Sequence, residues 1–177
     1  SVEDAAKPSK QVVTITAVGD CTLATDDAAV ADDSFVSMVE EQDDYTYFFE
    51  NVADIFEEDD LTIVNFEGTL SKRGTRQDKQ FAFRGDPDYV EILTSSSVEA
   101  ASLANNHSSD YGKESYDDTI KYLEDAGIAV VDGTKVEIME INGVTVGLVG
   151  IYALNETRAA ELDEAMEKVK KEGAELI

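Results

Sequence analysis

The chain has 177 residues, with 14 lysines and arginines against 39 aspartates and glutamates, so its formal net charge is −25 at pH 7. Hydrophobic residues make up 42% of it, which is enough for a packed core and excludes a chain that is disordered throughout. The negative charge argues against a nucleic-acid partner, because phosphates are neutralised by clustered lysine and arginine. Docking on anionic lipid is disfavoured for the same reason, and no apolar run approaches the roughly 20 residues of a membrane-spanning helix.

Two residue types occur once each and limit the sites that the chain can build. Cys21 is the one cysteine, which excludes an intramolecular disulfide and a zinc site made of cysteines. His107 is the one histidine, which excludes a metal site built from several histidines of this chain. Residues 1–10 are small, polar and charged, so we expect a disordered linker there and a folded domain over residues 11–177.

The first half of the chain alternates apolar, β-rich runs with helical patterns. In chain order we expect a strand over 12–19, a short amphipathic turn within 35–39, a helix over 45–58, a strand over 61–66, a polar loop over 71–80 and a short strand over 81–83. The polar loop holds the main group of basic residues in this acidic chain.

The second half continues this alternation and contains three local signals. Asp86 and Pro87 suit the N-cap and first turn of a helix, and Gly127 suits a helix end. Asn142-Gly143 lies between two apolar runs and is the strongest hairpin signal in the chain. We expect helices over 86–95, 113–126 and 158–171, strands over 98–103, 128–131, 136–141 and 144–149, and the start of another strand over 174–177.

Strands and helices that alternate along a chain favour a parallel sheet covered by helices. The sequence therefore predicts an α/β domain with a mixed, largely parallel sheet, in which the hairpin supplies the antiparallel pairing.

Polar residues follow the buried strands at the points where they end. Asp20 follows the first strand, Glu67 the second, and Asn106 and His107 the third. Ligands bind outside the carboxyl ends of parallel strands, so these side chains are expected to meet at one sheet edge. Two carboxylates and an amide oxygen suit Mg²⁺, Mn²⁺ or Ca²⁺, and an imidazole beside them could bind the metal or transfer a proton.

Each of these residues also has a purely structural explanation. Asp20 could cap a turn, Glu67 could be a surface residue, Asn106 could hold a left-handed turn, and His107 could be a hydrogen-bonded structural histidine. Other motifs are absent, because the chain has no P-loop and no nucleophile elbow.

Four segments carry a family resemblance: VTITAVGD at 13–20, IVNFEGTL at 63–70, FAFRGDPDYVEIL at 81–93 and ASLANNHSSDYG at 101–112. Together they closely resemble the bacterial capsule-synthesis CapA family, the poly-γ-glutamate capsule group, whose fold is a calcineurin-like metallophosphatase sandwich. The resemblance covers nearly the whole chain after residue 10 and implies layers of helices around a largely parallel sheet.

The resemblance also implies roles for individual residues. Asp20 matches the first metal-site aspartate, Glu67 a metal-bridging carboxylate, Asn106 a metal ligand and His107 the neighbouring acid–base histidine. Asn105 and Arg84 are candidate substrate contacts. Family members continue into motifs with further histidines that this chain lacks, so we expect the N-terminal part of a domain, truncated at its C-terminus, with an incomplete divalent-metal site and little activity of its own.

The function implied by the resemblance is capsule or exopolymer synthesis at the bacterial cell surface, with a membrane anchor in the full-length protein. Its chemistry would be metal-assisted phosphoryl or acyl transfer, and its partner an anionic polymer or a phosphorylated substrate. A non-catalytic surface scaffold and a general metal-dependent phosphoesterase are the alternatives. We also expect a homodimer formed through an exposed strand edge.

Overall fold

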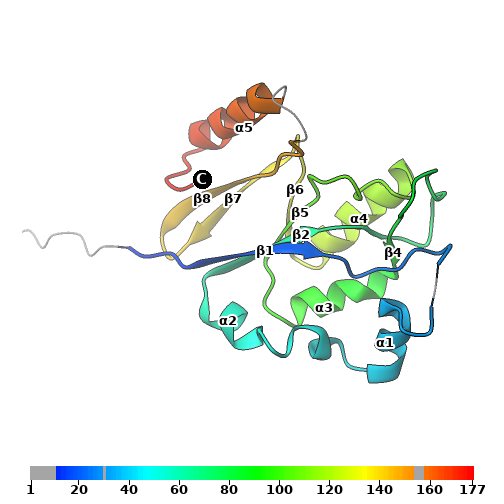
Figure 1. The fold of residues 1–177 in the computed structure, drawn as a ribbon. Coiled ribbons are helices and arrows are strands. Elements are labelled where there is room, and N and C mark those ends of the chain that lie inside the picture. The colour runs from blue at the N-terminus through cyan, green and yellow to red at the C-terminus, as the bar shows by residue number, and fades with distance from the viewer. Residues whose placement is uncertain (1–10, 30, 154–157) are drawn as a thin grey trace, which may run out of the picture.

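The computed structural model describes residues 11–29, 31–153 and 158–177, so the linker expected over residues 1–10 lies outside the described part. At its centre is a parallel sheet of four strands in the order β1-β2-β5-β6 (Figure 1). These strands are β1 (Ile15–Cys21), β2 (Leu61–Phe66), β5 (Ala100–Ser102) and β6 (Ala129–Val131). The predicted α/β class is confirmed, and because the strands are parallel, their carboxyl ends lie at one edge of the sheet.

Helices, short strands and a hairpin surround this sheet. They are α1 (Phe35–Gln42), η1 (Tyr45–Phe49), α2 (Ala53–Glu58), β3 (Thr69–Leu70), β4 (Arg84–Gly85), η2 (Pro87–Tyr89), α3 (Val90–Thr94), α4 (Lys113–Asp125), β7 (Val136–Ile141), β8 (Val144–Val149) and α5 (Ala159–Lys171). Asp86 caps η2 as predicted, with its carboxylate accepting from the Asp88 amide. The β7–β8 hairpin turns at Asn142 and Gly143, which both have positive φ, as a primed turn requires.

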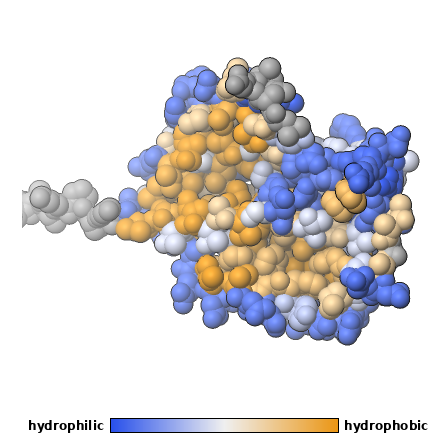
Figure 2. All heavy atoms as spheres, in the orientation of Figure 1, coloured by the Kyte–Doolittle hydropathy of each residue, from blue (hydrophilic) through white to orange (hydrophobic). Residues whose placement is uncertain are grey.

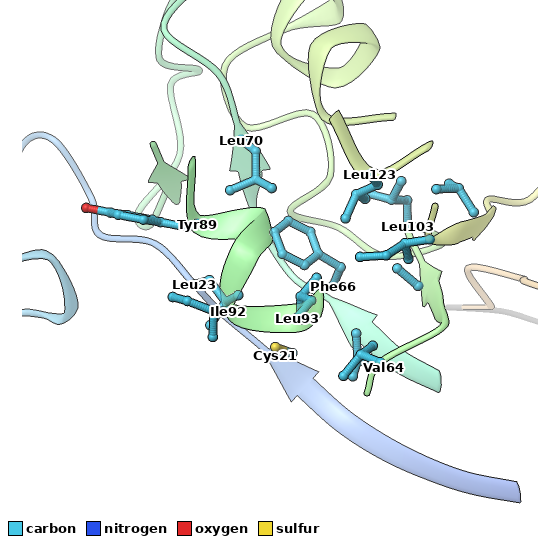
Figure 3. Packing of buried hydrophobic residues seen from close by; sticks show 14 of the residues in the cluster. Cys21, Leu23, Val64, Phe66, Leu70, Tyr89, Ile92, Leu93, Leu103 and Leu123 are labelled. Atoms are coloured by element: carbon cyan, nitrogen blue, oxygen red, sulfur yellow. The ribbon is translucent and has the colours of Figure 1, made fainter. Parts of the chain in front are cut away.

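The main hydrophobic core lies on one face of the sheet, under α1 to α4 (Figure 3). Side chains alternate along β2, so Val64 and Phe66 point into this core while Leu61 and Ile63 point to the opposite face. Phe66 is fully buried, and Cys21 at the end of β1 is only 8% exposed. Because these side chains are closely packed, the core fixes the positions of the strand ends relative to one another.

The hairpin covers part of the opposite face, and α5 packs on the hairpin. Leu61 and Val131 of the sheet pack there against Ile141 and Val146 of the hairpin. A Cβ atom at Gly147 would lie 2.8 Å from the Cβ of Val169, so glycine allows α5 to approach β8 closely. Hydrophobic residues gather on the surface over the hairpin and the start of β1, where Ile15 is exposed (Figure 2).

The expected helix over 45–58 is wrong in one respect, because the structure divides it into η1 and α2. Asp44 caps η1, and Val52 then leaves the helical region with φ −131° and ψ −3°. The interruption lets neighbouring rings take different partners: Phe48 packs on Phe35 at 4.9 Å between ring centroids, and Phe49 on Phe56 at 5.6 Å.

The short strand expected over 81–83 is also wrong, because the pairing occurs at Arg84 and Gly85 of β4. The reason lies in two backbone amides just before it. The amide of Ala82 donates to the Asp26 carboxylate at 3.1 Å, and that of Phe83 donates to the Asp110 carboxylate at 2.7 Å. Side-chain acceptors thus replace the strand partner that these amides would otherwise need.

The strand expected over 174–177 takes the form of a single parallel bridge between Leu176 and Val146 of β8. The amide of Gly147 donates to the Leu176 carbonyl at 2.8 Å, so these residues pair with the hairpin of the same chain. Within the described ranges, no helix has the length and apolar character that crossing a bilayer requires.

Candidate functional site

The carboxyl ends of β1 and β2 meet at Asp20 and Asn65. A bulge at Gly19 shifts the register of β1, so that Asp20 lies opposite Asn65. The Asn65 side-chain amide donates to Oδ1 of Asp20 at 2.7 Å. This hydrogen bond orients an exposed carboxylate at the edge where the fold was predicted to place it.

Glu67 lies one residue beyond β2, beside the same edge. Its amide donates to the Cys21 carbonyl at 3.0 Å, which ties it to the end of β1. The following residue, Gly68, has φ +135° and little room for a side chain, since a Cβ atom would lie 3.2 Å from the Cβ of Phe83. Burial raises the pKa of Glu67 above its ordinary value, the nearby Asp20 carboxylate raises it further, and His107 opposes them.

Asn105 connects the end of β5 to this pair. Its side-chain amide donates to Asn65 Oδ1 at 3.1 Å and to the Phe66 carbonyl at 2.9 Å. Its Oδ1 accepts from the backbone amide of His107 at 2.9 Å. Asn105 therefore forms the bridge through which β2 fixes the loop that carries His107.

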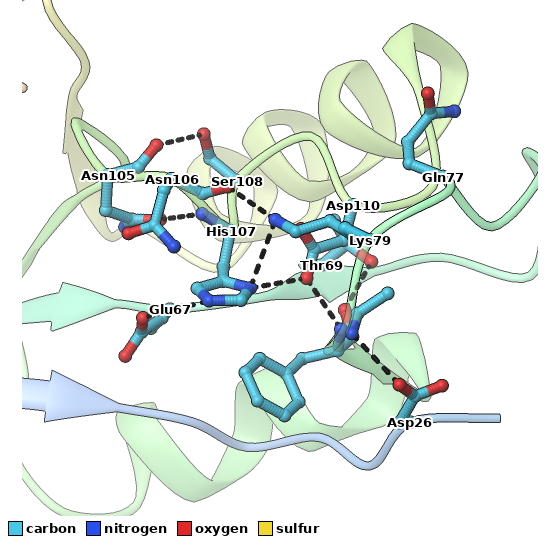
Figure 4. Close-up of polar contacts among 12 residues, drawn as sticks. Asp26, Glu67, Thr69, Gln77, Lys79, Asn105, Asn106, His107, Ser108 and Asp110 are labelled. Carbon is cyan, nitrogen blue, oxygen red and sulfur yellow. Dashed lines mark hydrogen bonds and ion pairs between the residues drawn. The ribbon is translucent and has the colours of Figure 1, made fainter. Parts of the chain in front are cut away.

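His107 is held between two carboxylates (Figure 4). Its Nδ1 lies 2.8 Å from Oδ2 of Asp110, and its Nε2 lies 3.6 Å from Oε1 of Glu67. The Phe83 ring packs against the imidazole with 4.7 Å between centroids. The Asp110 side chain is fully buried and pairs with Lys79, whose Nζ is 2.5 Å from Oδ1. The imidazole is thus positioned on one side by Asp110 and faces Glu67 with its other nitrogen.

Two predicted residues take other places. Asn106 is exposed, and its backbone carbonyl accepts from Lys79 Nζ at 2.8 Å. Arg84 pairs with Asp27 and lies over the Tyr111 ring, 3.8 Å from its centroid. Among the described residues, no contact joins the Arg84 side chain to the carboxylates beside His107. The structure therefore brings together Asp20, Glu67, Asn105 and His107, but neither the Asn106 side chain nor Arg84 contacts this cluster among the described residues.

The basic residues of the 71–80 loop are paired with carboxylates of the same chain. Arg73 binds Asp118, Arg76 binds Asp26 and Lys79 binds Asp110. Lys72 lies 3.0 Å from Asp86. The positive charge of this loop is therefore largely neutralised by carboxylates of the same chain.

The donor atoms at the site suit a hard divalent cation, since Asp20 and Glu67 supply two carboxylates beside an imidazole. In the described part of the chain, however, no group of three or more His, Cys, Asp or Glu side chains is arranged to hold an ion. One Asp20 oxygen already accepts from Asn65. The chemistry of Asp20 and Glu67 fits a divalent metal, because these two carboxylates already interact with each other at the strand ends.

Sequence reasoning missed three residues of this cluster: Asn65, Lys79 and Asp110. Asn65 is two residues before Glu67, so strand alternation places both on the same side. Asp110 is three residues after His107, a spacing that allows a contact within one turn of loop. No signal pointed to Lys79, because its position depends on the path of the whole 71–80 loop.

Comparison with known proteins agrees with the fold and the motifs. The family described as bacterial capsule synthesis protein PGA_cap matches residues 14–176. The probable polyglutamine synthesis accessory protein MT0602 of Mycobacterium tuberculosis (strain CDC 1551 / Oshkosh) is 37% identical over 73 residues, which are 41% of this chain and 19% of that relative. The capsule biosynthesis protein CapA of Bacillus anthracis is 27% identical over 115 residues, 59% of this chain and 28% of that protein.

The chain thus spans less than a third of the length of these relatives. The family match covers almost all of the described residues, including every strand end at the site. The chain therefore belongs to the bacterial capsule synthesis family PGA_cap, and its parallel sheet with covering helices is the metallophosphatase-like fold of that family.

Proposed function

We propose that this chain serves the synthesis of a capsule polymer in the bacterial cell envelope, and that the cluster around His107 is its working site. The observation that carries the proposal is the convergence of Asp20, Glu67 and His107 at one edge of the parallel sheet, with His107 Nε2 3.6 Å from Glu67. Family membership and the capsule-related names of the relatives support the polymer. The finer chemistry is a phosphoryl or acyl transfer.

A divalent ion would be held by Asp20 and Glu67, with the exposed Asn106 able to add an amide oxygen. When bound, such an ion supplies a positive charge that polarises the bond under attack. Among the described residues, no lysine or arginine forms an ion pair with Asp20 or Glu67. A cation there would therefore relieve the repulsion between Asp20 and Glu67.

His107 is the residue that would move a proton. Asp110 accepts from Nδ1 and fixes the ring, so that Nε2 is the nitrogen presented to the site. Asn105 holds the His107 backbone through its amide, and Phe83 limits how the ring can rotate. These contacts preorganise the imidazole before any substrate arrives.

A polyanionic product would be repelled by a chain of charge −25. The basic loop over 71–80 offers little compensation, because Arg73, Arg76 and Lys79 are bound to carboxylates. Divalent cations between polymer and protein are therefore the more favourable means of contact.

The metal site is tested by adding Mn²⁺ to the purified chain and following the broadening of backbone NMR signals. We expect the signals of Asp20, Glu67 and His107 to broaden first, and Glu67→Gln to abolish this preference. Asp54→Asn is the matched control, since it removes one exposed carboxylate from α2. Equal broadening over the whole acidic surface, in wild type and in Glu67→Gln alike, would overturn the metal site.

The second candidate is a non-catalytic role in assembling the synthesis machinery. It is favoured by the printed name of the mycobacterial relatives, which describes an accessory protein. Hydrolysis of p-nitrophenyl phosphate with Mn²⁺ separates the two. Hydrolysis that is lost in His107→Ala supports a catalytic role. If the chain binds Mn²⁺ but hydrolyses no member of a panel of phosphoesters, the accessory role is supported.

A further inference from the structure

A cavity of about 370 Å³ lies beside the candidate site, at the carboxyl ends of β5 and β6. Its lining includes Leu103, Asn105, Tyr116, Asp132, Thr134 and Tyr152. Asn105 belongs to both places, because its Oδ1 also accepts from the His107 amide at 2.9 Å. A ligand in the cavity would therefore lie next to the groups proposed to act on a substrate.

Asp132 is the charged residue of this cavity. Its Oδ1 accepts from the amides of Thr134 and Lys135 at 2.8 and 2.7 Å, and its Oδ2 accepts from the Tyr116 hydroxyl. Burial acts to raise the pKa of Asp132, but these hydrogen bonds outweigh it and keep the pKa below its ordinary value. The carboxylate is thus held as an anion.

This anion has no cationic partner among residues 11–29, 31–153 and 158–177. The nearest lysine along the chain, Lys135, instead pairs with Glu124 and Glu137. Hydrogen bonds alone stabilise this half-buried carboxylate, so its negative charge remains available to a ligand cation at the wall of the cavity.

The hydrogen-bonding groups of the cavity select the same kind of ligand. The Tyr116 hydroxyl hydrogen is committed to Asp132, so this side chain offers an oxygen acceptor and a ring face. Tyr152 adds a second ring and Leu103 an apolar surface. Acceptors, aromatic faces and a fixed anion favour a cation that carries N–H donors on an alkyl stem, and disfavour a phosphate or carboxylate.

We propose that this cavity binds the alkylammonium group of an amine-bearing molecule beside the His107 site. The inference names a substrate class for the proposed function and rests on that function only for the meaning of the neighbouring site. The binding itself is a property of Asp132, Tyr116 and Tyr152, and can be measured without any reaction.

The test is an NMR titration with three probes of equal length: n-butylammonium, 1-butanol and butyrate. Ionic strength is kept at about 0.15 M, where exposed charges are screened beyond about 8 Å. We expect n-butylammonium to shift the amide signals of Ala104, Gly133 and Thr134 saturably, 1-butanol to shift them only weakly, and butyrate not to shift them. Butyrate binding there as tightly as n-butylammonium would overturn the proposal.

A second acidic cavity provides the matched control. It has about 340 Å³ and is lined by Asp43, Tyr45, Asp88 and Tyr89 among others. It therefore offers tyrosine and carboxylate side chains of the same kinds as the first cavity, but it lies away from the sheet edge. Asp132→Asn should weaken n-butylammonium binding about tenfold, whereas Asp88→Asn should leave it unchanged. Equal shifts at both cavities would mean that the amine only follows the general charge of the chain, and the proposal would be wrong.

A further variant and a further probe keep the result of the titration interpretable. Tyr152→Leu retains Asp132 and its hydrogen bonds, so it should weaken binding even if Asp132→Asn fails to fold. A titration with Nα-acetyl-lysine amide tests whether the cavity takes the amine of a lysine side chain as well as that of a free small molecule. If neither Nα-acetyl-lysine amide nor n-butylammonium binds at the cavity, the proposal is wrong. Amine binding that persists without the Mn²⁺ preference for Glu67 supports the cavity while refuting the metal site, so the two failures are distinguishable.

Discussion

Lys79 and Asp110 are 31 residues apart in the sequence, yet Lys79 Nζ lies 2.5 Å from the Asp110 carboxylate beside the single histidine of the chain. The other oxygen of Asp110 accepts from His107 Nδ1 and from the Phe83 amide. A fully buried carboxylate thus joins the 71–80 loop, the segment just before β4 and the loop that carries His107. Three kinds of donor share this acceptor, and each depends on it for its position.

The first prediction concerns the tautomer of the His107 ring. Because Asp110 accepts at Nδ1, the neutral ring should carry its proton on Nδ1 and leave Nε2 as the acceptor facing Glu67. A long-range ¹H–¹⁵N spectrum of the imidazole above about pH 8 reads this directly, since no second histidine contributes signals. Asp110→Ala should shift the ring toward protonation at Nε2, whereas Asp117→Ala, in the exposed pair with Lys113, should not. A wild-type ring protonated at Nε2 would contradict the assignment.

The second prediction concerns stability. Asp110→Ala leaves the Lys79 ammonium, the Phe83 amide and His107 Nδ1 without their acceptor in a buried place. We expect the free energy of unfolding to fall by about 3 kcal/mol, the lower end for breaking a buried pair. Asp117→Ala should change it by less than about 1 kcal/mol, because that pair is exposed. Urea denaturation of both variants gives the comparison, and equal small effects would show that Asp110 is not a buried acceptor of this importance.

The residues of the site that the sequence predicts are those placed by strand geometry. Asp20, Glu67 and His107 each follow a strand of the parallel sheet, so their meeting at one edge needs only the strand order. Lys79 and Asp110 could not be assigned in this way. Their contact depends on a loop without hydrophobic periodicity, whose path is set by ion pairs formed only after folding.

The helical segments show a similar limit. The apolar spacing over 45–58 fits one helix, but it also fits η1 and α2 joined at Val52, because both arrangements bury the same phenylalanines. The misplaced strand before β4 has a different cause. Asp26 and Asp110 take the amides of Ala82 and Phe83, and such a side-chain competitor from a distant segment leaves no trace in the local pattern.

A third prediction follows from Arg76 and Asp26, which share two hydrogen bonds of 2.8 and 2.6 Å. The Arg76 guanidinium lowers the pKa of Asp26 well below its ordinary value of about 3.9, although burial acts in the opposite direction. The unfolded chain then binds the proton more readily than the folded one. The stabilisation is fully present above about pH 4 and is lost as the pH falls below that.

Arg76→Gln isolates this contribution from the changing net charge of the chain. The difference in free energy of unfolding between wild type and Arg76→Gln should be largest near about pH 6 and shrink toward about pH 2. Arg158→Gln, which removes an exposed pair with Glu161, serves as the control and should show little difference at any pH. A wild-type advantage that grows in acid would reverse the assigned sign.

A fourth prediction concerns Gly74, which anchors the same loop. Gly74 has φ +87°, and a Cβ atom there would lie 2.2 Å from the Tyr111 carbonyl, which accepts from the Thr75 amide at 2.9 Å. Gly74→Ala should lower the free energy of unfolding by at least about 3 kcal/mol, through both left-handed strain and displaced backbone. Gly127→Ala is the control at φ +86° with no atom within 4 Å, and it should cost only about 1 kcal/mol. If Gly74→Ala and Gly127→Ala lost equal free energy of unfolding in urea denaturation, the close contact with the Tyr111 carbonyl would not contribute, and the prediction would be wrong.

Cys21 gives the chain a built-in measure of how often the edge of its sheet opens. It is the one thiol, it ends β1, and burial raises its pKa to about 12, so almost none of it is thiolate at neutral pH. In the sheet order β1 lies outermost and pairs with β2 alone among the described strands. The rate of alkylation by a thiol reagent should therefore count the local openings that expose the carboxyl end of β1, the strand end that also carries Asp20 of the candidate site.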